Sequence, residues 1–315
     1  AYHLRRLCPI YPFPEERFRV TAIEESKETQ YGGHSLWEPL RRVMVRQPGV
    51  AASEHDWSDL AYLHPVDHQR SMDEHAAFVQ LLTASGAEVV IAPPDEPGYL
   101  DAVFCYDPSL MTNAGAILLR PGKPQRLDEV AFHARTYAEL EIPILGEIVE
   151  PGTVEGGDTL WIDETTLAVG RGYRTNRAGI EQLQQILDPL GVNVVAYDLA
   201  HYHGPGECLH LMSFISPVDD RLAVVYLPLM PVQFVEDLQE RGWEFIEVPD
   251  EEFEPMACNV LALGPRHVVT MEGNPVTRAR MEAAGCTVEC YPGAEISYNR
   301  AGGPTCLSRP LWRRR

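Results

Sequence analysis

The chain has 315 residues, with 26 basic and 46 acidic side chains and a formal net charge of −20. This negative balance argues against a non-specific nucleic-acid binder and against a basic membrane anchor. Hydrophobic residues make up 45% of the chain, as in a folded globular protein. No apolar run approaches the roughly 18 residues of a membrane-spanning helix.

The cysteines and the N-terminal segment indicate a compartment. Seven cysteines without a Cys-x-x-Cys motif favour a reducing cytoplasm over a disulfide scaffold or a structural zinc site. The start carries scattered charges and no apolar signal-peptide core. Residues 1–30, with three closely spaced prolines, are predicted to be an arm on the surface of the domain or of a partner subunit. Residues 31–315 are predicted to form a single catalytic domain, and a homodimer is possible.

One pattern recurs after a first strand over residues 41–46: an amphipathic helix, a short turn and a hydrophobic strand. A glycine occupies the turn in four cases, as expected for a left-handed residue that ends a helix, and Glu141 occupies it in the fifth. The turns recur roughly every 50 residues, which is a repeat signal. The predicted helices span residues 73–85, 127–140, 177–190, 232–241 and 276–284.

Further strand candidates lie between these helices, so each unit offers about three strands and one helix. Five such units fit a closed ring, because no terminal unit then needs a cap. The alternative is a doubly wound α/β sheet. The sequence has no Gly-x-Gly-x-x-Gly after a strand and no phosphate-binding Gly-x-x-x-x-Gly-Lys-Ser/Thr, so nothing points to a nucleotide fold.

Cys306 follows Gly302-Gly303-Pro304-Thr305, a constrained turn that would present a thiol. A functional cysteine needs a partner that lowers its pKa or shuttles protons. The other cysteines are interpreted as small buried hydrophobic residues.

Three other segments are weak signals when taken singly. In residues 154–159, Glu155 and Asp158 flank a glycine pair, which is also typical of a turn. In residues 208–212, alternation places His210 opposite two leucines of a strand, where a histidine is more often structural. In residues 101–108, Asp101 and Asp107 share a face only if the strand is unbroken.

Together and in order, these motifs resemble those of the guanidine-modifying enzymes, or penteins, which include dimethylarginine dimethylaminohydrolase, arginine deiminase and the amidinotransferases. The resemblance implies a five-bladed ββαβ propeller of α/β class with pseudo-fivefold symmetry. It covers about residues 31–311. The motifs are Asp-x-x-Phe-x-x-Asp (101–107), Arg-Pro-Gly-x-Pro-x-Arg (120–126), Glu-Gly-Gly-Asp (155–158), Arg-Thr-Asn (174–176), His-Leu (210–211) and Gly-Gly-x-x-Cys (302–306).

The resemblance also implies roles for single residues. Cys306 would attack the guanidinium carbon, and His210 would protonate the leaving amine and then activate water. Glu155 and Asp107 would pair with the guanidinium, and Asp158 would brace the Glu155 turn. Phe104 would line the pocket. Arg126 and Arg174 would contact the substrate carboxylate. Such roles suit the chemistry, since a guanidinium is a flat cation with a fixed fork of N–H donors.

Three departures bear on the substrate. Met212 stands where deiminases and amidinotransferases carry an aspartate, which favours an N-alkylated substrate. Arg300 resembles the deiminase arginine that binds the substrate carboxylate, and Tyr106 replaces a carboxylate beside Asp107. We therefore expect a cytoplasmic hydrolase that acts on the guanidino C–N bond of arginine or N-methylated arginine, without a metal or cofactor.

The expected partner is a small cationic guanidino substrate, and neither nucleic acid nor membrane. Two alternatives stay open. An amidinotransferase would resolve the covalent intermediate with an amine instead of water. A catalytically inactive propeller would serve as a binding module.

Polar groups without a predicted role are interpreted as solvated. They include the histidines between residues 64 and 75 and the acidic run Asp250–Glu252. The three arginines at residues 313–315 are interpreted as a short mobile tail.

Overall fold

Fifteen strands in the described residues pair into five three-stranded sheets. The computed structural model describes residues 30–93, 97–206 and 209–314, so the predicted arm lies, except for Gln30, outside the described residues. The strands are β1 (Leu40–Arg46), β2 (Glu88–Ala92), β3 (Ser109–Thr112), β4 (Gly115–Leu118), β5 (Ile144–Glu147), β6 (Thr159–Asp163), β7 (Thr166–Arg171), β8 (Asn193–Asp198), β9 (Ile215–Asp219), β10 (Leu222–Val225), β11 (Glu244–Glu247), β12 (Leu261–Gly264), β13 (His267–Met271), β14 (Thr287–Tyr291) and β15 (Arg309–Arg313). The α-helices are α1 (Asp56–Asp59), α2 (His68–Ala84), α3 (Glu129–Glu139), α4 (Arg177–Leu187), α5 (Val232–Glu240), α6 (Asp250–Phe253) and α7 (Pro275–Ala283).

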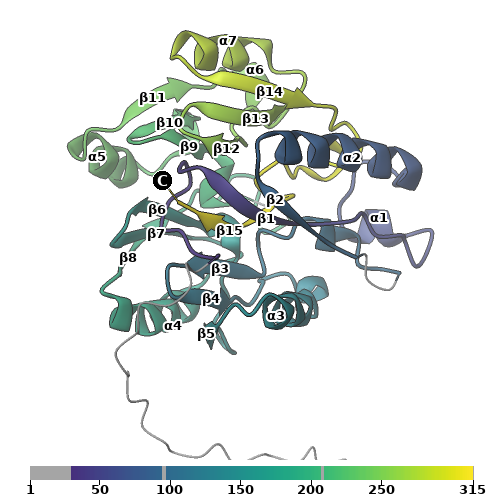
Figure 1. Cartoon of the computed structure of the whole chain (residues 1–315), viewed down its shortest axis with the longest axis horizontal. Coiled ribbons are helices and arrows are strands. Elements are labelled where there is room, and N and C mark those ends of the chain that lie inside the picture. The colour runs from purple at the N-terminus through teal and green to yellow at the C-terminus, as the bar shows by residue number, and fades with distance from the viewer. Residues whose placement is uncertain (1–29, 94–96, 207–208, 315) are drawn as a thin grey trace, which may run out of the picture.

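Each sheet repeats one order of pairing. In the sheet β3–β4–β5, the middle strand pairs antiparallel with β3 and parallel with β5, and α3 connects β4 to β5. A parallel pair needs a long crossover, and the helix supplies it. The unit is therefore ββαβ. Five of these units confirm the predicted α/β propeller with pseudo-fivefold symmetry (Figure 1).

The last strand closes the ring. β15 pairs antiparallel with β1, so it completes the sheet to which β1 and β2 belong. Figure 1 shows the sheets around a common centre, with α2, α3, α4, α5 and α7 at the periphery. A closed ring leaves no unit with an uncovered apolar face at its end, which removes the need for capping repeats.

Burial differs between the strands of one unit. The first strands β3 and β12 are buried at every position, whereas the third strands β5 and β8 expose many of theirs. The first strands therefore lie toward the centre of the ring and the third strands toward its rim. Apolar clusters fill the five junctions between neighbouring sheets, one cluster at each.

The turns that suggested the repeat adopt the expected conformation. The backbone φ is positive at all five turn residues, from 55° at Glu141 to 89° at Gly86. Among these five turn residues, Glu141 is the one that is not glycine, so its side chain adds a steric cost to the left-handed conformation that glycine avoids.

Most predicted helices and strands are present with shifted ends, but three strands escaped prediction. β3, β9 and β15 have four or five residues and are mostly buried, so they show no alternation of apolar and polar residues. Conversely, residues 101–107 are no strand: a 3₁₀ helix spans Leu100–Val103. His210 precedes a 3₁₀ helix over Leu211–Ser213 instead of lying in a strand.

Some polar groups predicted to be solvated are buried. His75 packs in α2, and Glu252 accepts hydrogen bonds from the backbone of Val276 and Thr277 at the start of α7. Arg313 belongs to β15 and donates to the carbonyls of Glu38 and Ala262. None of the helices that the structure describes has the length and apolar content needed to cross a membrane.

Candidate active site

Five residues of the site converge because they occupy equivalent places in successive units. Each of the five lies a few residues ahead of the first strand of its sheet, and these strands lie toward the centre of the ring. Asp107 precedes β3, Asp158 precedes β6, His210 precedes β9, Asn259 precedes β12 and Cys306 precedes β15.

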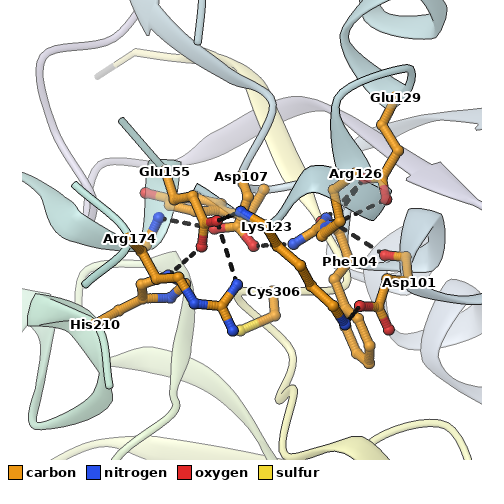
Figure 2. Close-up of polar contacts among 12 residues, drawn as sticks. Asp101, Phe104, Asp107, Lys123, Arg126, Glu129, Glu155, Arg174, His210 and Cys306 are labelled. Carbon is orange, nitrogen blue, oxygen red and sulfur yellow. Dashed lines mark hydrogen bonds and ion pairs between the residues drawn. The ribbon is translucent and has the colours of Figure 1, made fainter. Parts of the chain in front are cut away.

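One narrow cavity receives most of the predicted side chains. Asp101, Phe104, Asp107, Arg126, Arg174, His210, Arg300 and Cys306 all line it, and so does Met212. Glu155 and Asp158 do not line it; Glu155 is hydrogen-bonded to the His210 ring, and Asp158 accepts from the backbone N–H of the next residue, Leu211. Figure 2 shows that His210, Cys306 and Asp107 reach the site from different segments, with the Arg174 guanidinium drawn between His210 and Cys306.

Cys306 has a hydrogen-bond donor that sequence reasoning missed. The Asn259 side-chain nitrogen Nδ2 lies 3.2 Å from Cys306 Sγ, and its Oδ1 accepts from Thr305 N at 3.1 Å. The second contact fixes which end of the amide faces the sulfur. An N–H donor toward sulfur favours the thiolate, which is the nucleophilic form. The signal for Asn259 was its position two residues before a first strand, like that of Asp107.

His210 is held by a buried carboxylate. Its Nε2 lies 2.6 Å from Glu155 Oε2, and its backbone N–H donates to Ser213 Oγ at 2.9 Å. Glu155 is fully buried, and its Oε1 accepts from Gly122 N at 2.9 Å and pairs with Arg174 Nη1 at 3.4 Å. The oxygens of Glu155 thus face His210 and these donors, and its pairing with a guanidinium stays a prediction.

The charge state of Glu155 follows from competing effects. Burial alone would raise the pKa of Glu155, but the hydrogen bond and charge of His210 and the charges of Arg174 and Arg126 lower it. The net pKa is lowered, so Glu155 is an anion at neutral pH. A fixed negative charge beside the imidazole stabilises the imidazolium that general acid catalysis requires.

Asp107 is the carboxylate closest to the reacting end of the cavity. Its Oδ2 pairs with Arg126 Nη1 at 2.6 Å, and its Oδ1 accepts from Gly157 N at 2.9 Å. Arg126 is buried and also binds Glu129 through Nε and Nη2 and the carbonyl of Phe104. Arg126 thus holds Asp107 in place. Arg126 also lines the cavity, and its contact with a substrate carboxylate stays a prediction.

Asp158 connects three segments of the site. Its Oδ2 accepts from Thr175 Oγ1 at 2.6 Å, and its Oδ1 accepts from Leu211 N at 3.0 Å. Burial raises the pKa of Asp158 to about 6, although His210, Thr175 and Leu211 act in the opposite direction. Through Leu211, Asp158 fixes the segment that carries His210.

The raised pKa of Asp158 predicts a pH dependence of folding stability. The native carboxyl keeps its proton up to about pH 6, whereas the unfolded chain releases it near the ordinary value of 3.8. Its contribution to stability is therefore full at lower pH and is lost as pH rises from about 4 to about 6. We expect the stability of the wild type relative to Asp158→Asn to fall across that window, as measured by urea unfolding. A difference that is constant with pH would contradict the assignment.

Two glycines shape the cavity wall. A Cβ at Gly157 would lie 2.3 Å from His210 Nδ1, and a Cβ at Gly302 would lie 2.2 Å from the Phe104 ring. Any side chain at either position would displace the group it faces. These contacts explain why glycines occur in both motifs.

Asp107, Glu155 and His210 also form a possible metal-binding group, since one ligand atom from each lies within 4.8 Å of the others. The two carboxylates already pair with Arg126 and Arg174. These cations disfavour a metal ion by charge repulsion.

Comparison with known proteins gives a consistent family. A model for eukaryotic N,N dimethylarginine dimethylhydrolase matches residues 51–290. An N(G),N(G)-dimethylarginine dimethylaminohydrolase of Streptomyces coelicolor is 30% identical over 271 residues, which cover 86% of this chain and 96% of that protein. An arginine deiminase of Listeria welshimeri is 26% identical over 263 residues, covering 69% of this chain and 64% of that protein. A solved structure of the Pseudomonas aeruginosa dimethylarginine dimethylaminohydrolase, a variant complexed with citrulline, has a TM-score of 0.71 and 25% identity, covering 86% of this chain and 98% of that one.

The ring of five ββαβ units and a cavity lined by a thiol, an imidazole and a carboxylate define a guanidine-modifying enzyme of the pentein class. Within that class, the family match covers about three quarters of the sequence. The chain belongs to the dimethylarginine dimethylaminohydrolase family.

Proposed function

We propose that the protein hydrolyses the guanidino C–N bond of arginine or N-methylated arginine, giving citrulline and ammonia or a methylamine. The observation that carries the proposal is one cavity lined by Cys306, His210 and the carboxylate of Asp107. In it, Cys306 is hydrogen-bonded to Asn259 and His210 to Glu155. The P. aeruginosa relative binds citrulline, the product this reaction would give.

The geometry supports a two-stage mechanism. Asp107 pairs with the guanidinium edge, and the Cys306 thiolate adds to the guanidinium carbon. His210 protonates the departing nitrogen, which leaves as ammonia or a methylamine. A water molecule, deprotonated by His210, then adds to the thiouronium carbon and releases the thiolate and citrulline. A covalent intermediate divides one high barrier into two lower ones.

Other residues hold these groups in place. Glu155 orients and charges His210, Asp158 fixes the His210 segment, and Arg126 fixes Asp107. Phe104 lines the cavity beside the planar group. Arg174, which pairs with Glu155, and Arg300, which faces Asp101, also line the cavity, and we expect them to contact a substrate carboxylate.

A panel of guanidino compounds tests the proposal, with citrulline, ammonia and methylamines as products to be measured. Addition of glycine as an amine acceptor tests the amidinotransferase alternative, because a transferase would form a new guanidino compound. Absence of any product from any guanidino compound would favour the inactive binding module. The cytoplasmic location and the homodimer stay predictions.

The preference for methylated substrates is expected to depend on Met212. Its side chain lines the cavity and also packs in the apolar cluster between the third and fourth sheets. A methionine can repack around an N-methyl group, whereas an aspartate would leave an unpaired charge against it. We expect Met212→Asp to shift the ratio of kcat/KM from methylated toward unmethylated arginine. A ratio that does not move would assign Met212 to the core alone.

A further inference from the structure

The end of the cavity around Asp101 receives the part of the substrate remote from the guanidino group. In Figure 2, Asp101 and His210 lie on opposite sides of Cys306. Asp101 and Asp107 are the carboxylates among the described residues that line the cavity. Asp107 belongs to the reacting end, so Asp101 is the acceptor in a position to meet a remote ammonium group.

Lys123 already occupies that acceptor. Its Nζ lies 2.5 Å from Asp101 Oδ2 and 3.2 Å from the carbonyl oxygen of Leu60. Both side chains are nearly buried, at 11% and 5% exposure, so the pair is screened little by water. An ammonium group of the chain itself, from outside the residues that line the cavity, thus already pairs with the carboxylate that a substrate ammonium would need.

A second cation faces the other oxygen of Asp101. Arg300 Nε lies 3.5 Å from Asp101 Oδ1, and the Arg300 guanidinium lies 5.9 Å from the centre of the Tyr62 ring. Lys123 and Arg300 together outweigh the single charge of Asp101. A further cation placed here would be repelled, whereas a carboxylate would be attracted.

We propose that the cavity also accepts ω-guanidino carboxylic acids that lack an α-amino group, because Lys123 already pairs with the carboxylate that an α-ammonium would need. This inference rests on the proposed function. The chemistry is unchanged: one water is added, one ammonia or methylamine leaves, and the guanidino acid becomes an ω-ureido acid. The carboxylate is bound by the cations at the remote end, and the chain between it and the guanidino group is apolar.

A matched pair of substrates tests the inference. The pair is arginine and δ-guanidinovalerate, which is arginine without its α-amino group, each in unmethylated and N-methylated form. We expect kcat/KM for the amino-free member to equal or exceed that of the amino acid. If the α-ammonium were bound by a charge-assisted hydrogen bond, its removal would cost roughly 10- to 100-fold.

The outcomes separate the two proposals. Arginine compounds favoured more than about tenfold would overturn this inference and leave the proposed function standing. Turnover of neither substrate class would overturn both. The products are citrulline or δ-ureidovalerate, identified by mass spectrometry together with the released amine.

A variant assigns the effect to Lys123. Lys123→Met keeps the length of the side chain, removes the ammonium and leaves Asp101, which lines the cavity, to pair with a substrate ammonium. We expect the ratio of kcat/KM to move toward arginine by roughly 10- to 100-fold. Arg278→Met, which removes a cation from an exposed ion pair with Glu282, is the control and should leave the ratio unchanged. A merely structural role of Lys123 would lower both rates and leave their ratio unmoved, which would overturn the assignment.

Discussion

Replacement of Cys306 by serine is expected to abolish turnover while the fold is retained. A hydroxyl is far less ionised than a thiol at neutral pH, and the donor Asn259 cannot compensate for that difference. Circular dichroism and thermal unfolding should match the wild type, because Cys306 is only partly buried. Citrulline and ammonia release give the measure of activity.

The wild type should reveal the intermediate directly. Acid quenching during turnover, followed by peptide mass spectrometry, is expected to find a substrate adduct on the Cys306 peptide. Cys290, which is also partly buried, provides the control thiol and should stay unmodified. Normal turnover by the serine variant, or an adduct on Cys290 alone, would remove Cys306 from the mechanism.

Glu155→Gln and Asp107→Asn are expected to change different kinetic constants. Glu155 does not line the cavity and acts through His210, so its amide should lower kcat roughly 10- to 100-fold with little change in KM. Asp107 lines the cavity, so Asp107→Asn should also weaken substrate binding and raise KM. Both measurements are steady-state kinetics on arginine and methylarginine.

The exposed carboxylate of Glu282 supplies a control, because Glu282→Gln breaks only a surface ion pair. Its kinetics should equal those of the wild type. Unchanged kinetics in both site variants would refute the guanidinium-binding and histidine-orienting roles. A KM effect in Glu155→Gln equal to that in Asp107→Asn would instead place Glu155 in contact with substrate.

The repeat was readable from the sequence because each helix ends in a turn with a local chemical signature. Gly86 and Gly191 are such residues, and Glu141 shows that the position, more than the residue type, is what repeats. Three of the five first strands, β3, β9 and β15, were missed, since a short strand buried on both faces carries no periodicity. Missing these strands in the prediction matters, because they position residues of the site.

The candidate residues of the site came from resemblance in sequence, but their arrangement depends on tertiary contacts. No local pattern shows that Glu155 is hydrogen-bonded to His210, 55 positions away. The ion pairs of Arg126 with Asp107 and Glu129, and of Lys123 with Asp101, are equally invisible in the sequence. Asn259 was missed because an asparagine ahead of a strand has no distinctive sequence environment. Its role is visible only once the fifth unit is aligned with the second.

The pairing of β15 with β1 has a consequence for how activity is acquired. Nearly the whole described chain separates residues 40–46 from residues 309–313, with which they pair. Contacts between such distant segments are slow to form. Cys306 sits three residues before β15, so the nucleophile reaches its place in the same step that shuts the ring. The contact that closes the ring and the contact that positions the thiol are therefore the same, so the complete site depends on the pairing of the two ends of the domain.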